Sequence, residues 1–271
     1  MFNIRCFLRA GLFLLAVIGF RIVPLIYAQQ QVSDFQFQYE QYRQEVTQFE
    51  VARNDYLKHE TLASKNEAAA KTQKFILQRA ATFRTYFAAL RQAVAENNGI
   101  SESDKSSTDS KLNEQINWLK DYEDNINNLS NPSLEQLFNY SDIFEARESD
   151  YRLLGFETLA HVLIGKIVSL NQEYSLLLND LEPYVQKSPA GYLTNWLKEA
   201  RKSLSESEQH IEAAKEVLKD IHKGTVTQQR AERIFASVQT EVNASQEVLQ
   251  KGMGYQKEIV RKLNETLSIE N

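Results

Sequence analysis

The sequence predicts an all-α fold: an elongated bundle of about five long helices with coiled-coil-like packing, preceded by a signal peptide. Two observations lead to this prediction. Glycine and proline are scarce, with nine and four residues among 271, whereas sheet proteins of this length need many turns and usually contain more of both. Apolar residues also recur in alternating steps of three and four over long stretches, which is the spacing of helices packed as in a coiled coil.

Residues 1–28 have the pattern of a secretory signal peptide. Arg5 and Arg9 precede an apolar run over 10–20, and Ala28 is a small residue before a glutamine tract. This order predicts export and cleavage after Ala28. An uncleaved membrane anchor is the alternative. However, the run of 11 apolar residues is shorter than the ~20 that span a bilayer, and extending it would bring Arg21 into the membrane.

Without residues 1–28 the chain has 243 residues, 28 basic and 36 acidic side chains, and a net charge of −8. We expect no nucleic-acid partner, because such binding depends on clustered Lys and Arg. The one cysteine, Cys6, lies in the predicted signal peptide, so packing and not disulfides must stabilise the mature chain. We therefore expect an extracytoplasmic protein, secreted, periplasmic or at the cell surface. Residues 1–28 would contact the membrane only if they are retained.

The first mature helix is predicted over about 33–96, with a possible bend near 64–66. Two stripes of large apolar residues mark its faces. They are Phe35, Tyr39, Tyr42, Val46, Phe49 and Tyr56, and then Ile76, Ala80, Phe83, Phe87, Leu90 and Val94. The alternation over 35–39 also fits a short strand or an irregular lead-in. Gly99 is predicted to end the helix as a left-handed cap, and residues 101–110 form a polar connection.

Four further helices are predicted, separated by breaks at Pro132, Pro189 and Gly224. The second helix carries Leu112, Ile116, Leu119, Ile126 and Leu129. The third carries Leu163, Ile167, Leu170, Tyr174, Leu177, Leu181 and Tyr184. The fourth carries Leu193, Leu197, Ala200, Leu204, Ser207, Ile211, Ala214, Leu218 and Ile221. The fifth carries Phe235, Val238, Val242, Ser245, Leu249, Gly252, Gln256, Ile259 and Leu263. Gly252 and Gly254 lower helix propensity and predict a kink or fraying there. Two lobes are possible, a helical hairpin over 29–130 and a three-helix region over 131–271.

Charge is distributed in opposed blocks. Residues 68–95 contain five basic and no acidic side chains, and residues 101–150 contain twelve acidic and four basic ones. We expect these blocks to face each other in an antiparallel hairpin, because opposite charges then meet. The alternative is that the basic residues form a face for an anionic ligand or a partner. They are Lys71, Lys74, Arg79, Arg84 and Arg91.

Motifs of enzyme chemistry are missing from the sequence. The four histidines are far apart, and none forms a His-x-x-x-His or Glu-x-x-His pair of the kind that binds metal on a helix. Gly165-Lys166 lacks the remainder of a phosphate-binding loop, and no Gly-x-Ser-x-Gly nucleophile motif occurs. We therefore expect no metal, cofactor or catalytic residue, although a bundle enzyme without a short motif stays a third possibility.

The sequence thus predicts a non-enzymatic exported protein that acts as a scaffold or protein-interaction rod in the cell envelope or outside the cell. Its partners are expected to be proteins or further copies of itself, since heptad stripes can be satisfied within or between chains. The alternative is an extracytoplasmic module that binds a ligand or lipid between its helices. Weak packing at the alanine-rich 61–74 region and at Gly252–Gly254 would support that alternative.

Overall fold

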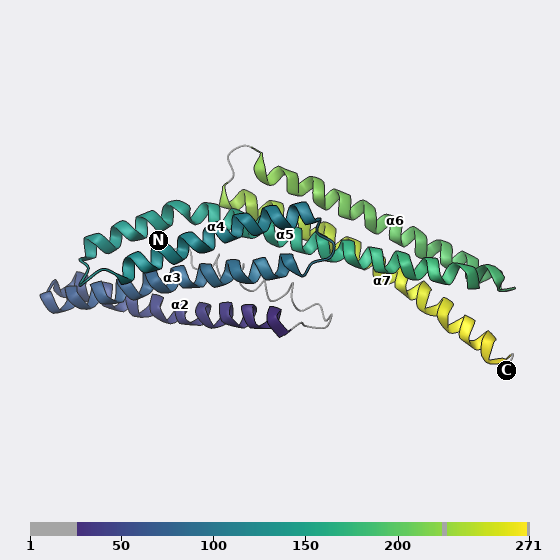
Figure 1. The fold of residues 1–271 in the computed structure, drawn as a ribbon, viewed down its shortest axis with the longest axis horizontal. Coiled ribbons are helices and arrows are strands. Elements are labelled where there is room, and N and C mark those ends of the chain that lie inside the picture. The colour runs from purple at the N-terminus through teal and green to yellow at the C-terminus, as the bar shows by residue number, and fades with distance from the viewer. Residues whose placement is uncertain (1–25, 224–226, 270–271) are drawn as a thin grey trace. The chain divides into compact units, whose positions relative to one another are not determined.

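A computed structural model describes residues 26–223 and 227–269. Of these residues 92% are helical and none lies in a strand, which confirms the predicted all-α class and the helical bundle. The α-helices are α2 (Ile26–His59), α3 (Leu62–Ala95), α4 (Glu102–Asn127), α5 (Leu134–Lys187), α6 (Gly191–Lys219) and α7 (Gln228–Ile269), with a short 3₁₀ turn, η1 (Asp220–His222) (Figure 1). Residues 1–25 of the predicted signal peptide and the predicted break at Gly224 lie outside the described residues.

The predicted single helix over 33–96 is wrong: the chain reverses at residues 60–61, so that α2 and α3 pack against each other. Glu60 has a left-handed φ of 47°, which ends α2. Thr61 then caps α3, because its Oγ1 accepts from the backbone N–H of Ser64 at 3.1 Å while Ser64 Oγ accepts from the N–H of Thr61. The sequence has neither glycine nor proline at this turn, which is why its apolar pattern read as continuous.

Aromatic side chains join the two helices of this hairpin. Phe35 meets Tyr86 with ring centroids 5.4 Å apart, and Phe49 stacks on Phe75 at 4.8 Å. Partner numbers fall along α3 as they rise along α2, so the helices are antiparallel (Figure 1). The whole stripe predicted on α3, from Ile76 to Val94, is buried.

Helix α4 packs antiparallel on α3, as the opposed charge blocks predict. Arg84 bonds to Glu123 at 2.9 Å and Arg91 to Asp109 at 2.8 Å. The connection between α3 and α4 is shorter than expected, because most of the predicted polar segment over 101–110 is the first part of α4. The first turn of α4 carries Glu102 and Asp104. Acidic side chains there stabilise a helix N-terminus through its dipole.

The chain forms two compact units. Unit 1 contains the described residues up to Glu96 together with Glu102–Thr158, and unit 2 contains Asn97–Ser101 and the chain from Leu159 onward. The helix α5 contributes its first part to unit 1 and its second part to unit 2. The predicted lobes, 29–130 and 131–271, stay a prediction about folding domains.

In unit 2, α6 and the turn η1 that follows it bury all nine residues of their predicted stripe, from Leu193 to Ile221. Helix α6 runs antiparallel to α7, as the pairs His210–Glu241 and Ser207–Ser245 show. The predicted stripe on α5 is wrong in its last turns. Leu177 and Tyr184 are 47% and 62% exposed, whereas the next residues, Leu178 and Val185, are buried. The buried stripe passes through Asn171, a polar residue that the apolar pattern avoids.

Two glycines with predicted roles are closely packed, and the predicted left-handed cap at Gly99 is wrong. Helix α7 continues through Gly252 without fraying, and an added Cβ there would lie 2.6 Å from the Tyr174 hydroxyl. Gly99 is not in the left-handed region; an added Cβ there would lie 1.9 Å from the carbonyl oxygen of Gly165. Asn97 fixes the same loop by donating from Nδ2 to the Val162 carbonyl at 2.8 Å.

By length and composition, α5 is the one described helix that resembles a membrane span. Its most apolar 18-residue stretch has a mean hydropathy of 1.6, and half of that stretch is buried inside the protein. A core helix of a water-soluble protein has the same properties, so the stretch is weak evidence for a membrane.

Candidate functional site

The most unusual charged group of unit 1 is the guanidinium of Arg79, on α3. Its side chain is 3% exposed. The guanidinium carbon lies 4.1 Å from the ring centroid of Phe144 and 5.4 Å from that of Phe75. Burying a charge in such a position costs free energy unless contacts with aromatic rings and hydrogen bonds replace its hydration. The ring faces supply the first kind of contact.

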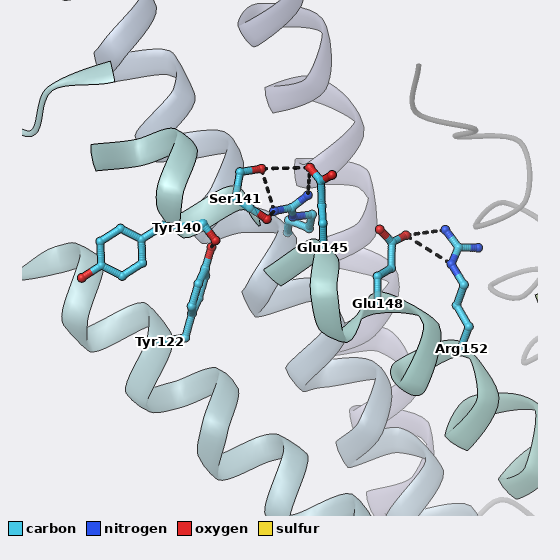
Figure 2. Close-up of polar contacts among 7 residues, drawn as sticks. Tyr122, Tyr140, Ser141, Glu145, Glu148 and Arg152 are labelled. Atoms are coloured by element: carbon cyan, nitrogen blue, oxygen red, sulfur yellow. Dashed lines mark hydrogen bonds and ion pairs between the residues drawn. The ribbon is translucent and has the colours of Figure 1, made fainter. Parts of the chain in front are cut away.

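Hydrogen bonds from α5 supply the second kind. Arg79 Nη2 donates to Ser141 Oγ at 3.2 Å, and Ser141 Oγ donates to Glu145 Oε1 at 3.2 Å. The Glu145 carboxylate also lies 3.9 Å from Arg79 Nη1 and is 44% exposed. Figure 2 shows Ser141 and Glu145 one turn apart on α5, with a dashed line between their side chains. We call Arg79, Ser141, Glu145 and Phe144 the Arg79 cluster.

Two tyrosines from the neighbouring helices lie close to this cluster. Tyr122, on α4, donates to the carbonyl of Tyr140 at 2.9 Å, next to Ser141 (Figure 2). Burial raises the pKa of Tyr122 to about 12, although the nearby Arg79 charge lowers it in part. Burial likewise raises the pKa of Tyr42, on α2, to about 12 against the same lowering effect of Arg79. Both phenols are therefore neutral at ordinary pH and act as polar members of the core.

One turn further along α5, Glu148 and Arg152 form an ion pair. Arg152 Nη2 lies 2.5 Å from Glu148 Oε1, with the two side chains 16% and 21% exposed (Figure 2). Together with the Arg79 cluster, this pair gives α5 a polar line within unit 1.

The structure places the five basic residues of the predicted face in different surroundings. Arg79 faces α5 inside the core, whereas Arg84 and Arg91 reach α4. Lys71 Nζ donates to Gln48 Oε1 of α2 at 2.7 Å, and Lys74 is exposed. The structure therefore joins Arg84 and Arg91 on the α4 side, and it does not bring all five onto one surface.

Sequence reasoning named Arg79 but missed what surrounds it. Ser141 and Phe144 are more than 60 residues away along the chain, and nothing in the local pattern of either segment links them. The one signal was a basic residue inside the apolar stripe of α3, between Ile76 and Phe83. Such a position predicts a buried charge that needs partners from other helices.

Within the part of the chain that the structure describes, no group of three or more His, Cys, Asp or Glu side chains is placed to hold a metal ion. No protein-family model matches this chain, and neither a curated protein nor a solved structure shows significant similarity to it.

Proposed function

We propose that this protein is a non-enzymatic exported helical bundle that acts as a scaffold or protein-interaction rod in the cell envelope or outside the cell. The main support is how its charged residues are used. Four of the five basic residues in the 68–95 stretch bond to other helices of the same unit: Lys71, Arg79, Arg84 and Arg91. Residues that looked available for a ligand instead hold the bundle together.

The length of the helices supports the rod. At ~1.5 Å per residue, the 42 residues of α7, all of them in unit 2, form a helix about 60 Å long. A spherical domain of this size has a radius of gyration of only about 18 Å. We therefore propose an elongated particle in solution.

Exposed apolar side chains at the α2–α3 turn offer a contact point for a partner protein. Leu57 is 56% exposed and Leu62 is 75% exposed, on either side of the turn. When a partner protein covers such aliphatic side chains, their apolar surface is removed from water, which favours binding. This support is independent of the charged contacts inside unit 1.

The proposal is tested on protein isolated from its native host. We expect mass spectrometry to find a mature chain that begins at Gln29 in the extracytoplasmic fraction, and X-ray scattering to give a radius of gyration well above that of a sphere. Cross-linking in intact cells should capture a defined partner or further copies. Exchanging Leu57 and Leu62 for Ser should reduce that capture, whereas exchanging the exposed Lys65 for Ser should not. A cytoplasmic, spherical protein with no specific cross-link would refute the proposal.

The alternative is a module that binds a ligand or lipid, and the burial of Gly252 and Ala68 counts against its two supports from the sequence. Gly252 is covered by Tyr174 and Ser203, so no space opens there. In the alanine-rich segment Ala68 is 3% exposed and packed. Thermal melting separates the two functions, because a ligand that binds the native state raises the melting temperature, whereas a scaffold protein is unaffected by lipids or small molecules.

A further inference from the structure

The core of unit 2 contains one layer of polar side chains, one from each of its three long helices. Asn171 of α5 is 5% exposed, and Ser207 of α6 and Ser245 of α7 are fully buried. On α6 and α7, the stripe residues on either side of this layer are apolar: Leu204, Ile211, Val242 and Leu249. We call the three residues the polar layer.

Hydrogen bonds connect the layer across all three helices. Ser207 Oγ donates to Asn171 Oδ1 at 2.9 Å and lies 2.6 Å from Ser245 Oγ. A hydroxyl has one proton, so the proton between the two serines comes from Ser245. The resulting chain of donors runs from α7 through α6 to α5. It uses both serine hydroxyls, which would be costly to bury unpaired.

Apolar heptad stripes alone do not fix how helices align. Ser207 faces Ser245 in the structure, so sliding α7 along α6 by seven residues would place Ser207 opposite Val238 or Gly252. The same slide would place Ser245 opposite Ala200 or Ala214. All four of these residues belong to the stripes of α6 and α7, so apolar contacts would be largely kept. The Ser245 hydroxyl, however, would be buried without its partners on Ser207, the hydroxyl and the backbone carbonyl, whereas Ser207 would keep Asn171.

We propose that the polar layer is a register lock: it selects the one alignment of α5, α6 and α7 in which its hydrogen bonds form. A polar residue at a buried heptad position has this effect in coiled coils, at a cost in stability. The layer shows that cost here, because Asn171 Nδ2 has no hydrogen-bond partner among the described residues. Gly252 reinforces the lock, since it is the residue that accommodates the Tyr174 hydroxyl.

Disulfide trapping tests the lock, because the only natural cysteine is Cys6, which is changed to Ser in all variants. His210 and Glu241 are in contact at 2.8 Å, so the pair H210C and E241C reports the native register. The pair H210C and V248C reports α7 shifted by seven residues. We expect the first pair to cross-link in the otherwise native chain and the second pair to remain reduced.

The decisive variant replaces the layer with apolar residues, Asn171→Leu, Ser207→Ala and Ser245→Ala. We expect cross-linking of the shifted pair to rise on the order of tenfold, with helical content unchanged and the melting temperature equal or higher. The double variant Ser207→Ala with Ser245→Ala changes the core volume less and should give an intermediate rise in cross-linking of the shifted pair. It serves as the test if the triple variant does not fold. Unchanged selectivity for the native pair in whichever of these variants folds would overturn the proposal.

Discussion

Two residues at turns between helices adopt the left-handed backbone conformation, and their side chains tolerate it to different degrees. Glu60 has a φ of 47° and Asn131 has a φ of 51°. Asparagine tolerates this region, whereas a side chain such as glutamate is strained there by roughly 1–2 kcal/mol. The turn that separates α2 from α3 therefore stores strain, and the turn that precedes α5 stores less.

Glu60→Gly should stabilise the protein. Glycine removes the left-handed strain but loses more chain entropy on folding, so a net gain of about 0.5–1 kcal/mol in the free energy of unfolding is expected. Urea denaturation followed by circular dichroism measures it, with Asn131→Gly as a control that changes stability less. A lower stability of the Glu60→Gly variant would show that the glutamate side chain contributes more than its backbone costs.

Gly99→Ala should destabilise the protein, whereas Gly254→Ala should stabilise it. An added Cβ at Gly99 meets backbone atoms of Gly165, but at Gly254 it meets nothing within 4 Å. Overpacking costs roughly 1–3 kcal/mol, and alanine gains about 1 kcal/mol over glycine inside a helix. Thermal melting of the two variants should give shifts of opposite sign, and shifts of equal sign would contradict the close contact at Gly99.

The contacts that arginine side chains make between helices differ in how deeply they are buried. Arg79 connects α3 to α5 from the core, whereas Arg84 connects α3 to α4 with a side chain that is 37% exposed. Exposed pairs contribute about 0–1 kcal/mol, while breaking a buried charged contact costs several. Arg79 and Arg84 are therefore the same type of side chain on the same helix, one buried and one partly exposed.

Arg79→Ala is expected to lower the free energy of unfolding by about 2–4 kcal/mol, because it removes the stacked guanidinium and leaves Ser141 without its donor. Arg84→Ala should lower it by less than about 1 kcal/mol. Guanidinium chloride is avoided because it screens charge, so urea titrations measure both values. Similar losses in the two variants would mean that burial of Arg79 does not matter to stability.

The sequence predicted the buried face of a helix well where apolar residues dominate it. On α6 only Ser207 of the stripe is polar, its neighbours in the stripe are apolar, and every position was placed correctly. On α5 the buried stripe includes Asn171, so the apolar pattern followed Leu177 and Tyr184 instead. The turn at Glu60 was missed because it contains neither glycine nor proline, and its one local signal is Thr61, the N-cap of α3. The Arg79 cluster was missed because its members come from two distant segments.

For the whole chain, buried tyrosines predict unequal stability of the two units at high pH. Burial raises the pKa of Tyr122 in unit 1 and of Tyr174 in unit 2 to about 12, whereas tyrosines of an unfolded chain ionise near pH 10. The stabilisation is therefore complete below about pH 10 and is lost as the pH rises towards 12. Among the side chains that the structure describes, unit 1 has five tyrosines with a raised pKa and unit 2 has one: Tyr39, Tyr42, Tyr86, Tyr122 and Tyr151 against Tyr174.

Unit 1 should accordingly unfold at a lower pH than unit 2, with each tyrosine contributing at most about 1.4 kcal/mol per pH unit. The two tryptophans of the chain report the units separately, since Trp118 lies in unit 1 and Trp196 in unit 2. Fluorescence of the variants Trp196→Phe and Trp118→Phe is followed during alkaline titration. Tyr86→Phe should move the Trp118 transition to higher pH. Coincident transitions, or an earlier one at Trp196, would contradict this expectation.

The border between the two units has a practical consequence for anyone who wishes to study them apart. Thr158 and Leu159, which flank it, are both helical and almost entirely buried. A stop codon placed there would end the protein in the middle of helix α5, beside two residues that the intact chain buries, and would invite precipitation. Limited proteolysis of the intact molecule should therefore spare this point and cleave first at the connections between helices.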